Sequence, residues 1–243
     1  MKVIILAAGY GTRLYPLTYH IAKPLLLVNK KPMLNFLIDK IAILKKSFPI
    51  DEVRVVVNDK FYKDFLAWEK RYKIKVKIVN DGSTSPDDRL GAIKDMRFAM
   101  GKEKCDWLIL GGDNLFEDSL TSFLDFALDK ESNPSIGLYD LKSKKEATRF
   151  GIVSLNTKSR IVKFAEKPKK PASTLAASCV YFFPKKSLGL LNTFVKGHRS
   201  VDASGRYIAW LVRTAKVFGY ILKGKWIDIG HIDSLKLAEK AFK

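Results

Sequence analysis

The chain of 243 residues is long enough to bury one substantial core, and 47% of its residues are hydrophobic, which excludes a disordered chain. No apolar run is long enough to span a bilayer, and the apolar stretch at residues 1–8 is too short for a secretory signal, so we expect a cytoplasmic protein. The net charge of +19, from 44 basic and 25 acidic residues, indicates an anionic partner, either nucleic acid or phosphate-bearing molecules.

The first part of the chain, up to about residue 130, alternates between strand and helix patterns. Apolar runs or period-two patterns predict strands over residues 3–6, 53–57, 74–78 and 107–110. Apolar residues at helical spacing predict helices over residues 32–46, 61–72, 90–100 and 120–128, the last capped by Asp118 or Ser119. The alternation predicts an α/β fold with a Rossmann-like, mostly parallel (mixed) central sheet flanked by helices on both faces. A ligand is then expected at the carboxyl ends of the strands.

The second part of the chain is richer in strands, which we expect to extend the sheet and to build the other side of a cleft. Its predicted strands cover residues 136–141, 151–155, 161–164 and 180–183. Its predicted helices cover residues 188–194, 206–214 and 234–242. No repeat or low-complexity linker interrupts the sequence, so one domain over residues 1–243 is predicted.

A glycine-rich loop follows the first predicted strand and reads Gly9-Tyr10-Gly11-Thr12-Arg13, with Lys23 ten residues beyond the arginine. Glycines let the backbone bend tightly and turn its N–H groups toward an anion. The loop lacks both the third glycine of the dinucleotide fingerprint and the Gly-Lys-Ser/Thr of the P-loop. It therefore indicates either another kind of phosphate site or an ordinary turn with surface cations.

Two carboxylates stand at positions suited to a metal ion. Asp113 follows two glycines at the end of a predicted buried strand, and Asp228 lies in the sequence Trp-Ile-Asp-Ile-Gly at residues 226–230. Two carboxylates, completed by phosphate oxygens and water, make an oxygen site that suits Mg²⁺. For Asp113 alone, a role as a helix or turn cap is the stronger interpretation.

The whole string Leu-Ala-Ala-Gly-x-Gly-Thr-Arg-Leu-x-Pro-Leu-Thr, followed by Lys-Pro-Leu-Leu, resembles the signature of the sugar nucleotidyltransferases. These enzymes join a nucleoside triphosphate to a sugar 1-phosphate and release pyrophosphate, and the chain is similar to their glucose-1-phosphate thymidylyltransferase members. Gly-Asp-Asn, Phe-Gly-Ile-Val, Glu-Lys-Pro and Trp-x-Asp-x-Gly follow in family order, so the resemblance covers nearly the whole chain. It implies a nucleotide-binding half over about residues 1–130, a sugar-binding half over about 131–243, and Mg²⁺ as cofactor.

The resemblance also implies a role for individual residues. Those implied for nucleotide binding are Ala8, Gly9, Gly11, Thr12, Arg13, Lys23, Gly91 and Asp113. Those implied for the sugar phosphate are Gly151, Glu166 and Lys167, and the metal ligands are Asp113 and Asp228. Arg13 and Lys23 are the implied catalytic residues. Without the resemblance, Glu166 and Lys167 would be interpreted as a solvated pair in a lysine-rich turn.

Two departures from the family pattern leave the substrates open. Cys179 stands where relatives commonly carry a glycine, and with Cys105 we expect it to be a free thiol. The segment over residues 80–91, where relatives read the base, has no glutamine, and its Asp87 and Asp88 suit either base contacts or a helix cap. Gly91 is the predicted base-side residue because its missing side chain lets a flat base approach the backbone.

Two other functions remain alternatives to catalysis. One is a non-catalytic relative that binds a nucleotide sugar, which would be expected to lack Arg13, Lys23 or a metal aspartate; all are present. The other is a basic nucleic-acid-binding protein, although the lysine pairs are dispersed along the chain and no nucleic-acid motif occurs. We therefore expect a nucleoside triphosphate and a sugar 1-phosphate as partners, with no membrane or nucleic acid, and the oligomeric state open.

Overall fold

A central sheet organises the molecule in this computed structural model, which describes residues 1–198 and 204–242. The strand order is β10-β9-β11-β6-β1-β4-β5, and β8 pairs with both β11 and β12. The strands are β1 (Lys2–Leu6), β4 (Glu52–Val57), β5 (Lys77–Asn80), β6 (Trp107–Gly111), β8 (Ser135–Asp140), β9 (Gly151–Leu155), β10 (Ile161–Glu166), β11 (Leu175–Phe183) and β12 (Phe218–Ile221). Two short antiparallel pairs lie outside it: β2 (Leu27–Val28) with β3 (Lys31–Pro32), and β7 (Asn114–Phe116) with β13 (Trp226–Asp228).

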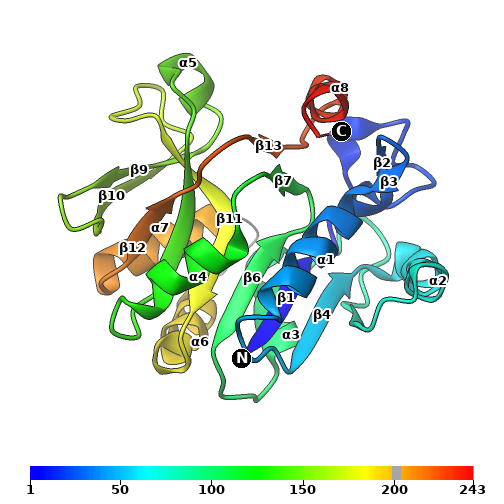
Figure 1. The fold of residues 1–243 in the computed structure, drawn as a ribbon, viewed down its shortest axis with the longest axis horizontal. Helices are drawn as coiled ribbons and strands as arrows, with labels where there is room; N and C mark the ends of the chain where they lie inside the picture. Colours follow the sequence, from blue (N-terminus) through cyan, green and yellow to red (C-terminus); the bar gives the residue numbers. More distant parts are fainter. Residues whose placement is uncertain (199–203, 243) are drawn as a thin grey trace.

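The sheet joins a parallel part to an antiparallel part (Figure 1). β1 pairs in parallel with β4 and with β6, and β4 pairs in parallel with β5. β11 is antiparallel to β6, β8 and β9, so the second part of the chain reverses the strand direction. The predicted Rossmann-like mixed sheet is therefore confirmed, with its parallel strands at the core. Leu6 and Gly111, the last residues of β1 and β6, are register partners. The loops that follow both strands therefore begin at the same end of the sheet, at the carboxyl ends of its parallel strands.

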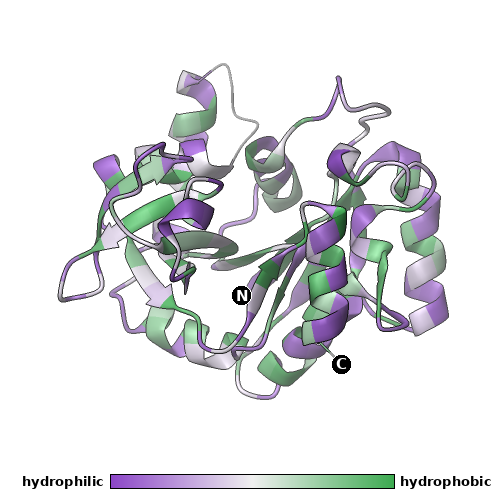
Figure 2. Ribbon diagram, turned by 90° about the horizontal axis from the view of Figure 1, so that it is seen from above, coloured by the Kyte–Doolittle hydropathy of each residue, from purple (hydrophilic) through white to green (hydrophobic). Residues whose placement is uncertain are grey.

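Helices cover both faces of the sheet, as predicted. They are α1 (Met33–Leu44), α2 (Tyr62–Tyr72), α3 (Ala92–Met100), α4 (Leu120–Leu128), α5 (Lys144–Ala147), α6 (Leu188–Gly197), α7 (Ser204–Thr214) and α8 (Ile232–Ala241). Successive strand residues point to opposite faces. Val3 and Ile5 pack in one core with α1, α2 and α4, whereas Ile4 packs in a second core with α3, α6 and α7. Figure 2 shows hydrophobic strands in the interior and hydrophilic residues along the outer sides of the helices.

The cap of α4 resolves one alternative left open by the sequence. The Ser119 hydroxyl accepts a hydrogen bond from the Thr121 amide, so Ser119 rather than Asp118 is the cap. Leu120, Phe123 and Leu124 form the buried stripe that holds this helix on the sheet. Within residues 1–198 and 204–242, no helix is both long and apolar enough to cross a membrane.

Strands β7, β12 and β13 were not among the predicted elements, and the strand predicted over residues 74–78 is shorter than expected. The strand there begins only at Lys77, because the preceding residues close helix α2. Lys73 adopts a left-handed conformation with φ of 53°, and the Ile74 amide donates to the Glu69 carbonyl. This is how a helix end satisfies its last carbonyls, so the period-two pattern of residues 74–76 serves a helix terminus rather than a strand.

Candidate active site

A cavity of about 480 Å³ opens at the carboxyl ends of β1 and β6, between the parallel and antiparallel parts of the sheet. Leu6 and Gly111 mark the ends of these two strands on its wall. The opposite wall carries residues from β9, β10, β11 and the start of α7. The ligand position expected for an α/β sheet therefore coincides with a cavity built by both parts of the chain.

Most of the predicted site residues line this cavity. They are Ala8, Gly9, Arg13, Lys23, Gly91, Asp113, Gly151, Glu166, Lys167 and Asp228. Gly11 and Thr12 are not among the lining residues. Gly11 has φ of +63°, and a Cβ there would be 3.1 Å from Thr18 Cγ2 and 3.2 Å from Lys23 Cβ. Gly11 thus makes the turn that carries Arg13, while the exposed Thr12 starts a short 3-10 helix.

Lys23 and Asp113 form a close ion pair inside the cavity. Lys23 Nζ lies 2.6 Å from Asp113 Oδ2, and the Lys23 side chain is only 10% exposed. Burial by itself would raise the pKa of Asp113, but the charge of Lys23 and hydrogen bonds from Lys23 and Asn114 lower it below its usual range. Asp113 is therefore an ionised residue of the β6–β7 turn, and the structure excludes the interpretation of Asp113 as the cap of α4.

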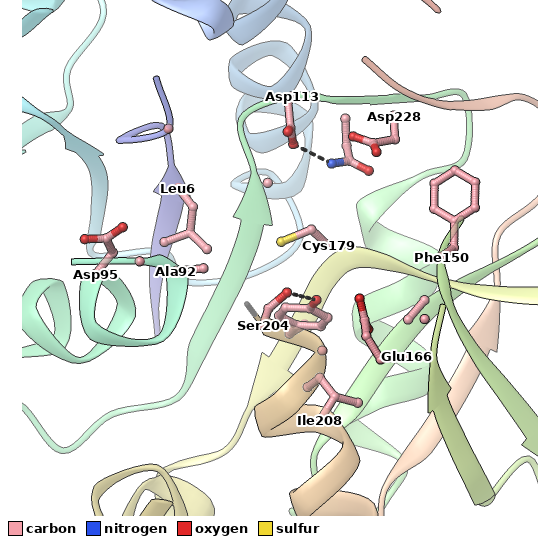
Figure 3. A pocket seen from close by; sticks show the side chains of 18 of the residues that line it. Leu6, Ala92, Asp95, Asp113, Phe150, Glu166, Cys179, Ser204, Ile208 and Asp228 are labelled. Atoms are coloured by element: carbon pink, nitrogen blue, oxygen red, sulfur yellow. Dashed lines mark hydrogen bonds between the residues drawn. The ribbon is translucent and has the colours of Figure 1, made fainter. Parts of the chain in front are cut away.

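Asp228 is brought to the same place by the small β7–β13 sheet. Asp228 is the register partner of Asn114, and the Ile229 amide donates to the Asp113 carbonyl at 3.0 Å. Burial and the nearby charge of Asp113 raise the pKa of Asp228 to about 6. Figure 3 shows both aspartates at one end of the cavity and Glu166 toward the other.

The two aspartates fit a Mg²⁺ ion that is completed by phosphate oxygens. Among residues 1–198 and 204–242, no group of three or more His, Cys, Asp or Glu side chains could hold a metal by itself. Mg²⁺ is commonly held by one or two carboxylates together with substrate phosphates and water, so a pair is sufficient. The raised pKa of Asp228 reflects two buried like charges, and a cation between them would relieve that repulsion.

The far wall packs closely around Glu166. A Cβ at Gly205 of α7 would lie 2.0 Å from Glu166 Oε2, and a Cβ at Gly151 would lie 3.1 Å from the same oxygen. Both glycines therefore make room for this carboxylate. Lys167 follows with φ of 43°, and its amide donates to the Phe150 carbonyl at 3.0 Å. Glu166 and Lys167 both line the cavity, and both remain exposed to solvent.

Cys179 lies between the aspartates and the Glu166 wall (Figure 3). A Cβ at Gly111 on the neighbouring strand would come within 2.7 Å of Cys179 Cβ, so these two positions cannot both carry side chains without a shift. Burial and the charge of Asp113 raise the pKa of the thiol to about 12, which keeps it neutral. Both Cys179 and Cys105 are free and partly buried, as predicted.

In the predicted base segment, Asp88 has a structural role. Asp88 accepts hydrogen bonds from the amides of Thr84 and Ser85, which lower its pKa to about 2. The Asp88 carboxylate is therefore occupied by hydrogen bonds within its own turn. Gly91, with φ of +84°, starts α3 and lines the cavity. Asp87 does not line the cavity.

The sequence interpretation gave no role to several residues of the cavity wall. They are Arg89, Asp95, Asn114, Arg149, Phe150, Tyr181, Ser204 and Trp226. Asn114 and Trp226 stand inside the quoted Gly-Asp-Asn and Trp-x-Asp-x-Gly motifs, so the signal for both was present. Ser204 has no such signal, because it lies in a helix distant in sequence from the strand whose Tyr181 hydroxyl donates to it at 3.2 Å.

The chain is similar to known proteins over nearly its whole length. The chain is 29% identical to the bifunctional protein GlmU of Methanococcus aeolicus over 230 residues, which cover 95% of the chain and 51% of that protein. It is 28% identical to a glucose-1-phosphate adenylyltransferase of Mycoplasma mobile over 250 residues, covering 96% of the chain and 65% of the relative. The chain thus spans about half the length of the GlmU proteins it matches.

A solved structure shares the fold. A crystal structure of a protein assigned as a glucose-1-phosphate thymidylyltransferase from Bacillus anthracis, in complex with sucrose, superposes with a TM-score of 0.84 at 21% identity. The match covers 99% of this chain and 94% of that one. The family profile described as nucleotidyl transferase matches residues 2–243. With its mixed sheet, its glycine loop and its paired aspartates in one cavity, the chain belongs to the nucleotidyl transferase family.

Proposed function

We propose that the protein is an enzyme that joins a nucleoside triphosphate to a sugar 1-phosphate, or to a related alcohol phosphate, and releases pyrophosphate in a Mg²⁺-dependent reaction. One observation carries the proposal: Arg13, Lys23 and Lys167, from both halves of the chain, line one cavity together with Asp113 and Asp228. The names of the similar adenylyltransferase and thymidylyltransferase are consistent with this reaction class. We assign residues 1–130 to the nucleotide and residues 131–243 to the acceptor.

The reaction requires two polyanions to meet. An oxygen of the acceptor phosphate attacks the α-phosphorus in line, and the bond from that phosphorus to the bridging oxygen of the pyrophosphate breaks. The attacking phosphate is already ionised at neutral pH, so the protein needs no general base. Its task is to neutralise charge and to hold the two reacting groups in line.

The positions of the basic residues suggest how this task is divided. Lys167, next to Glu166 on the far wall, would hold the acceptor phosphate, and Glu166 would accept hydrogen bonds from its hydroxyl groups. Lys23 would contact the α-phosphate. Arg13, whose guanidinium lies over Gly230, would hold the departing pyrophosphate together with backbone N–H groups of the glycine loop.

Asp113 and Asp228 would hold the metal. When bound there, Mg²⁺ supplies positive charge that stabilises the phosphate oxygens as charge shifts toward the leaving group. The protein's part is to keep both carboxylates close in a partly dry site, which is supported by the pairing of Asp228 with Asn114 and by the bond from the Ile229 amide to the Asp113 carbonyl.

The proposal is tested by measuring pyrophosphate release for each combination of a nucleoside triphosphate with a sugar phosphate or an alditol phosphate. We expect release from at least one triphosphate, and only when an acceptor phosphate and Mg²⁺ are both present; the productive pair identifies base and acceptor. Tight nucleotide-sugar binding without turnover would instead support a non-catalytic relative. Salt-dependent binding of nucleic acid without turnover would support the basic nucleic-acid binder.

A further inference from the structure

Asn114 lies between Trp226 and Asp113 in a chain of two hydrogen bonds. The indole Nε1 of Trp226 donates to Asn114 Oδ1 at 2.8 Å, and Asn114 Nδ2 donates to Asp113 Oδ1 at 2.8 Å. The second bond is a dashed line beside Asp113 in Figure 3. Asn114 is 4% exposed and Trp226 7% exposed, so water does not compete freely for these bonds. The other Asp113 oxygen, Oδ2, accepts from Lys23.

The chemistry of the two ends determines the residue between them. An indole N–H can only donate, and an ionised carboxylate can only accept. The residue that links Trp226 to Asp113 must therefore accept on one side and donate on the other, which the Asn114 amide does. Aspartate at this position would have no proton for Asp113 and would bring a third negative charge next to Asp228.

The neighbouring residues keep this chain of bonds in place. A Cβ at Gly111 would lie 2.8 Å from Asn114 Nδ2 and 3.1 Å from Asp113 Oδ1, so the glycine leaves the space that the amide needs. The Trp226 ring packs against Tyr139 and Phe150, each with its ring centroid 5.4 Å away. The direction of the indole N–H is therefore fixed by aromatic packing before any ligand binds.

We propose that Trp226 and Asn114 are positioning residues that hold the Asp113 carboxylate in the orientation in which it binds a divalent cation. The proposal rests on the function proposed above. It gives Trp226, from the second half of the chain, control over a metal ligand in the first half. Partners that hydrogen-bond to a metal ligand typically contribute about 10- to 100-fold to metal affinity.

The test measures metal binding directly rather than turnover. Mn²⁺ is titrated into the protein without nucleotide, and free Mn²⁺ is read by electron paramagnetic resonance. We expect Trp226→Phe, which keeps an aromatic ring but loses the N–H, to bind Mn²⁺ about tenfold more weakly than the wild type. Its matched control is Trp68→Phe, because Trp68 Nε1 donates to Asn35 Oδ1 at 2.7 Å in a buried bond of the same kind, and neither residue lines the cavity. We expect that control to bind Mn²⁺ like the wild type.

A double-mutant cycle separates positioning from a general loss of structure. If Trp226 acts through Asn114, then Trp226→Phe should not weaken Mn²⁺ binding further in an Asn114→Ala background. Additive losses of Mn²⁺ affinity in the double variant would show that Trp226 does not act through Asn114. If Trp226→Phe fails to fold in a melt without metal, Asn114→Ala alone carries the test, with the same tenfold loss expected.

The outcomes distinguish this inference from the proposed function. Wild-type Mn²⁺ affinity in both Trp226→Phe and Asn114→Ala would overturn the positioning role while leaving the metal site intact. Mn²⁺ binding that is absent in the wild type both without nucleotide and with a nucleoside triphosphate bound, or that is unchanged by Asp113→Asn and Asp228→Asn, would remove the metal site itself and the inference with it.

Discussion

Asp113 and Asp228 share a cavity but have opposite electrostatic surroundings. Asp113 has the cation of Lys23 at 2.6 Å, and its pKa is lowered. Asp228 is buried close to the negative charge of Asp113, and both effects raise its pKa to about 6. A carboxyl whose pKa is raised on folding binds its proton more tightly in the folded state. Its ionisation therefore costs stability as the pH rises from about 4 to about 6.

We predict opposite effects on stability from the two matching substitutions. Without metal, Asp228→Asn should be more stable than the wild type at pH 7, by on the order of 1 kcal/mol or more, and the gain should vanish below about pH 4. Asp113→Asn should be destabilised, because it leaves the Lys23 cation buried without its partner. Both should lose turnover. Urea melts across pH, paired with pyrophosphate assays, check this.

Two results of this experiment would contradict the prediction. If Asp228→Asn gives no stability gain at pH 7, the two carboxylates do not repel each other in the folded protein. If either variant keeps near-normal turnover, that residue is not a metal ligand.

Arg13 offers a simpler prediction. Its side chain is exposed and belongs to a loop, so Arg13→Ala should leave the melting temperature nearly unchanged. Turnover should fall about a hundredfold or more, because a charge that stabilises the departing pyrophosphate is lost. Arg213→Ala, which removes an exposed arginine of α7 outside the cavity, is the control and should be neutral in both assays. Equal activity of the two variants would withdraw the role of Arg13.

Lys23 shows what a motif can and cannot reveal about a residue. Its place in the Lys-Pro motif correctly indicated the cavity, but nothing in the sequence indicates that its side chain is 90% buried against Asp113. That fact depends on a contact between residues 90 positions apart. We therefore expect Lys23→Ala, unlike Arg13→Ala, to lose both stability and turnover.

Among the strands, those of the large sheet were largely predictable and the pair β7–β13 was not. β1, β4 and β6 are mostly apolar and largely buried on both faces, which a sequence pattern reveals. β7 and β13 have only three residues each and pair across more than 100 positions, so neither has a periodicity to detect. The motifs therefore identified the two aspartates, whereas only the structure shows that they lie close together.

Strand β4 carries the buried charged residue Arg54. Its ion pairs should make the stability of the protein depend on pH. Arg54, 6% exposed, is paired with Glu52 and Glu103, and Glu103 is also paired with Lys2. Hydrogen bonds from Arg54 to Glu52, and from Lys2 and Arg54 to Glu103, lower the pKa of both glutamates. Carboxyls with lowered pKa values contribute stability above their unfolded pKa, and this contribution is lost as the pH falls through the folded values.

We predict that Arg54→Met lowers the free energy of unfolding by about 2 kcal/mol at pH 7, because hydrogen bonds to charged groups are lost. The difference from the wild type should shrink as the pH falls below about 4.5, where the glutamates bind protons. Urea melts at pH 7 and pH 4 measure both effects. Parallel stability curves for the two proteins would show that the glutamates do not depend on Arg54.

The neighbouring strands β6 and β11 approach each other closely at Gly111 and Cys179, on the wall of the cavity. Gly111→Ala should destabilise the protein by about 1–3 kcal/mol, since the new Cβ would meet Cys179 Cβ at 2.7 Å. Adding Cys179→Gly should recover part of that loss, which thermal melts of the four proteins of the cycle would measure. No recovery would mean that the contact with Asn114, at 2.8 Å, accounts for the whole cost.

The charge of the whole chain bears on how the substrates arrive. A protein with a net charge of +19 attracts polyanions over distances that salt shortens. We predict that kcat/KM falls several-fold between about 50 mM and about 500 mM NaCl, mainly through KM, while the melting temperature changes little. Steady-state kinetics at several salt concentrations check this. A fall confined to kcat would locate the salt effect in the chemical step instead.

Strand β11 hydrogen-bonds to β6 on the parallel side and to β8 and β9 on the antiparallel side. The two walls of the cavity are thus joined through β11 into one sheet. We expect the cavity to close around substrates by movements of loops and side chains rather than by rotation of one half against the other. The same continuity predicts a single cooperative unfolding transition, with neither half surviving as a folded fragment when the other is removed.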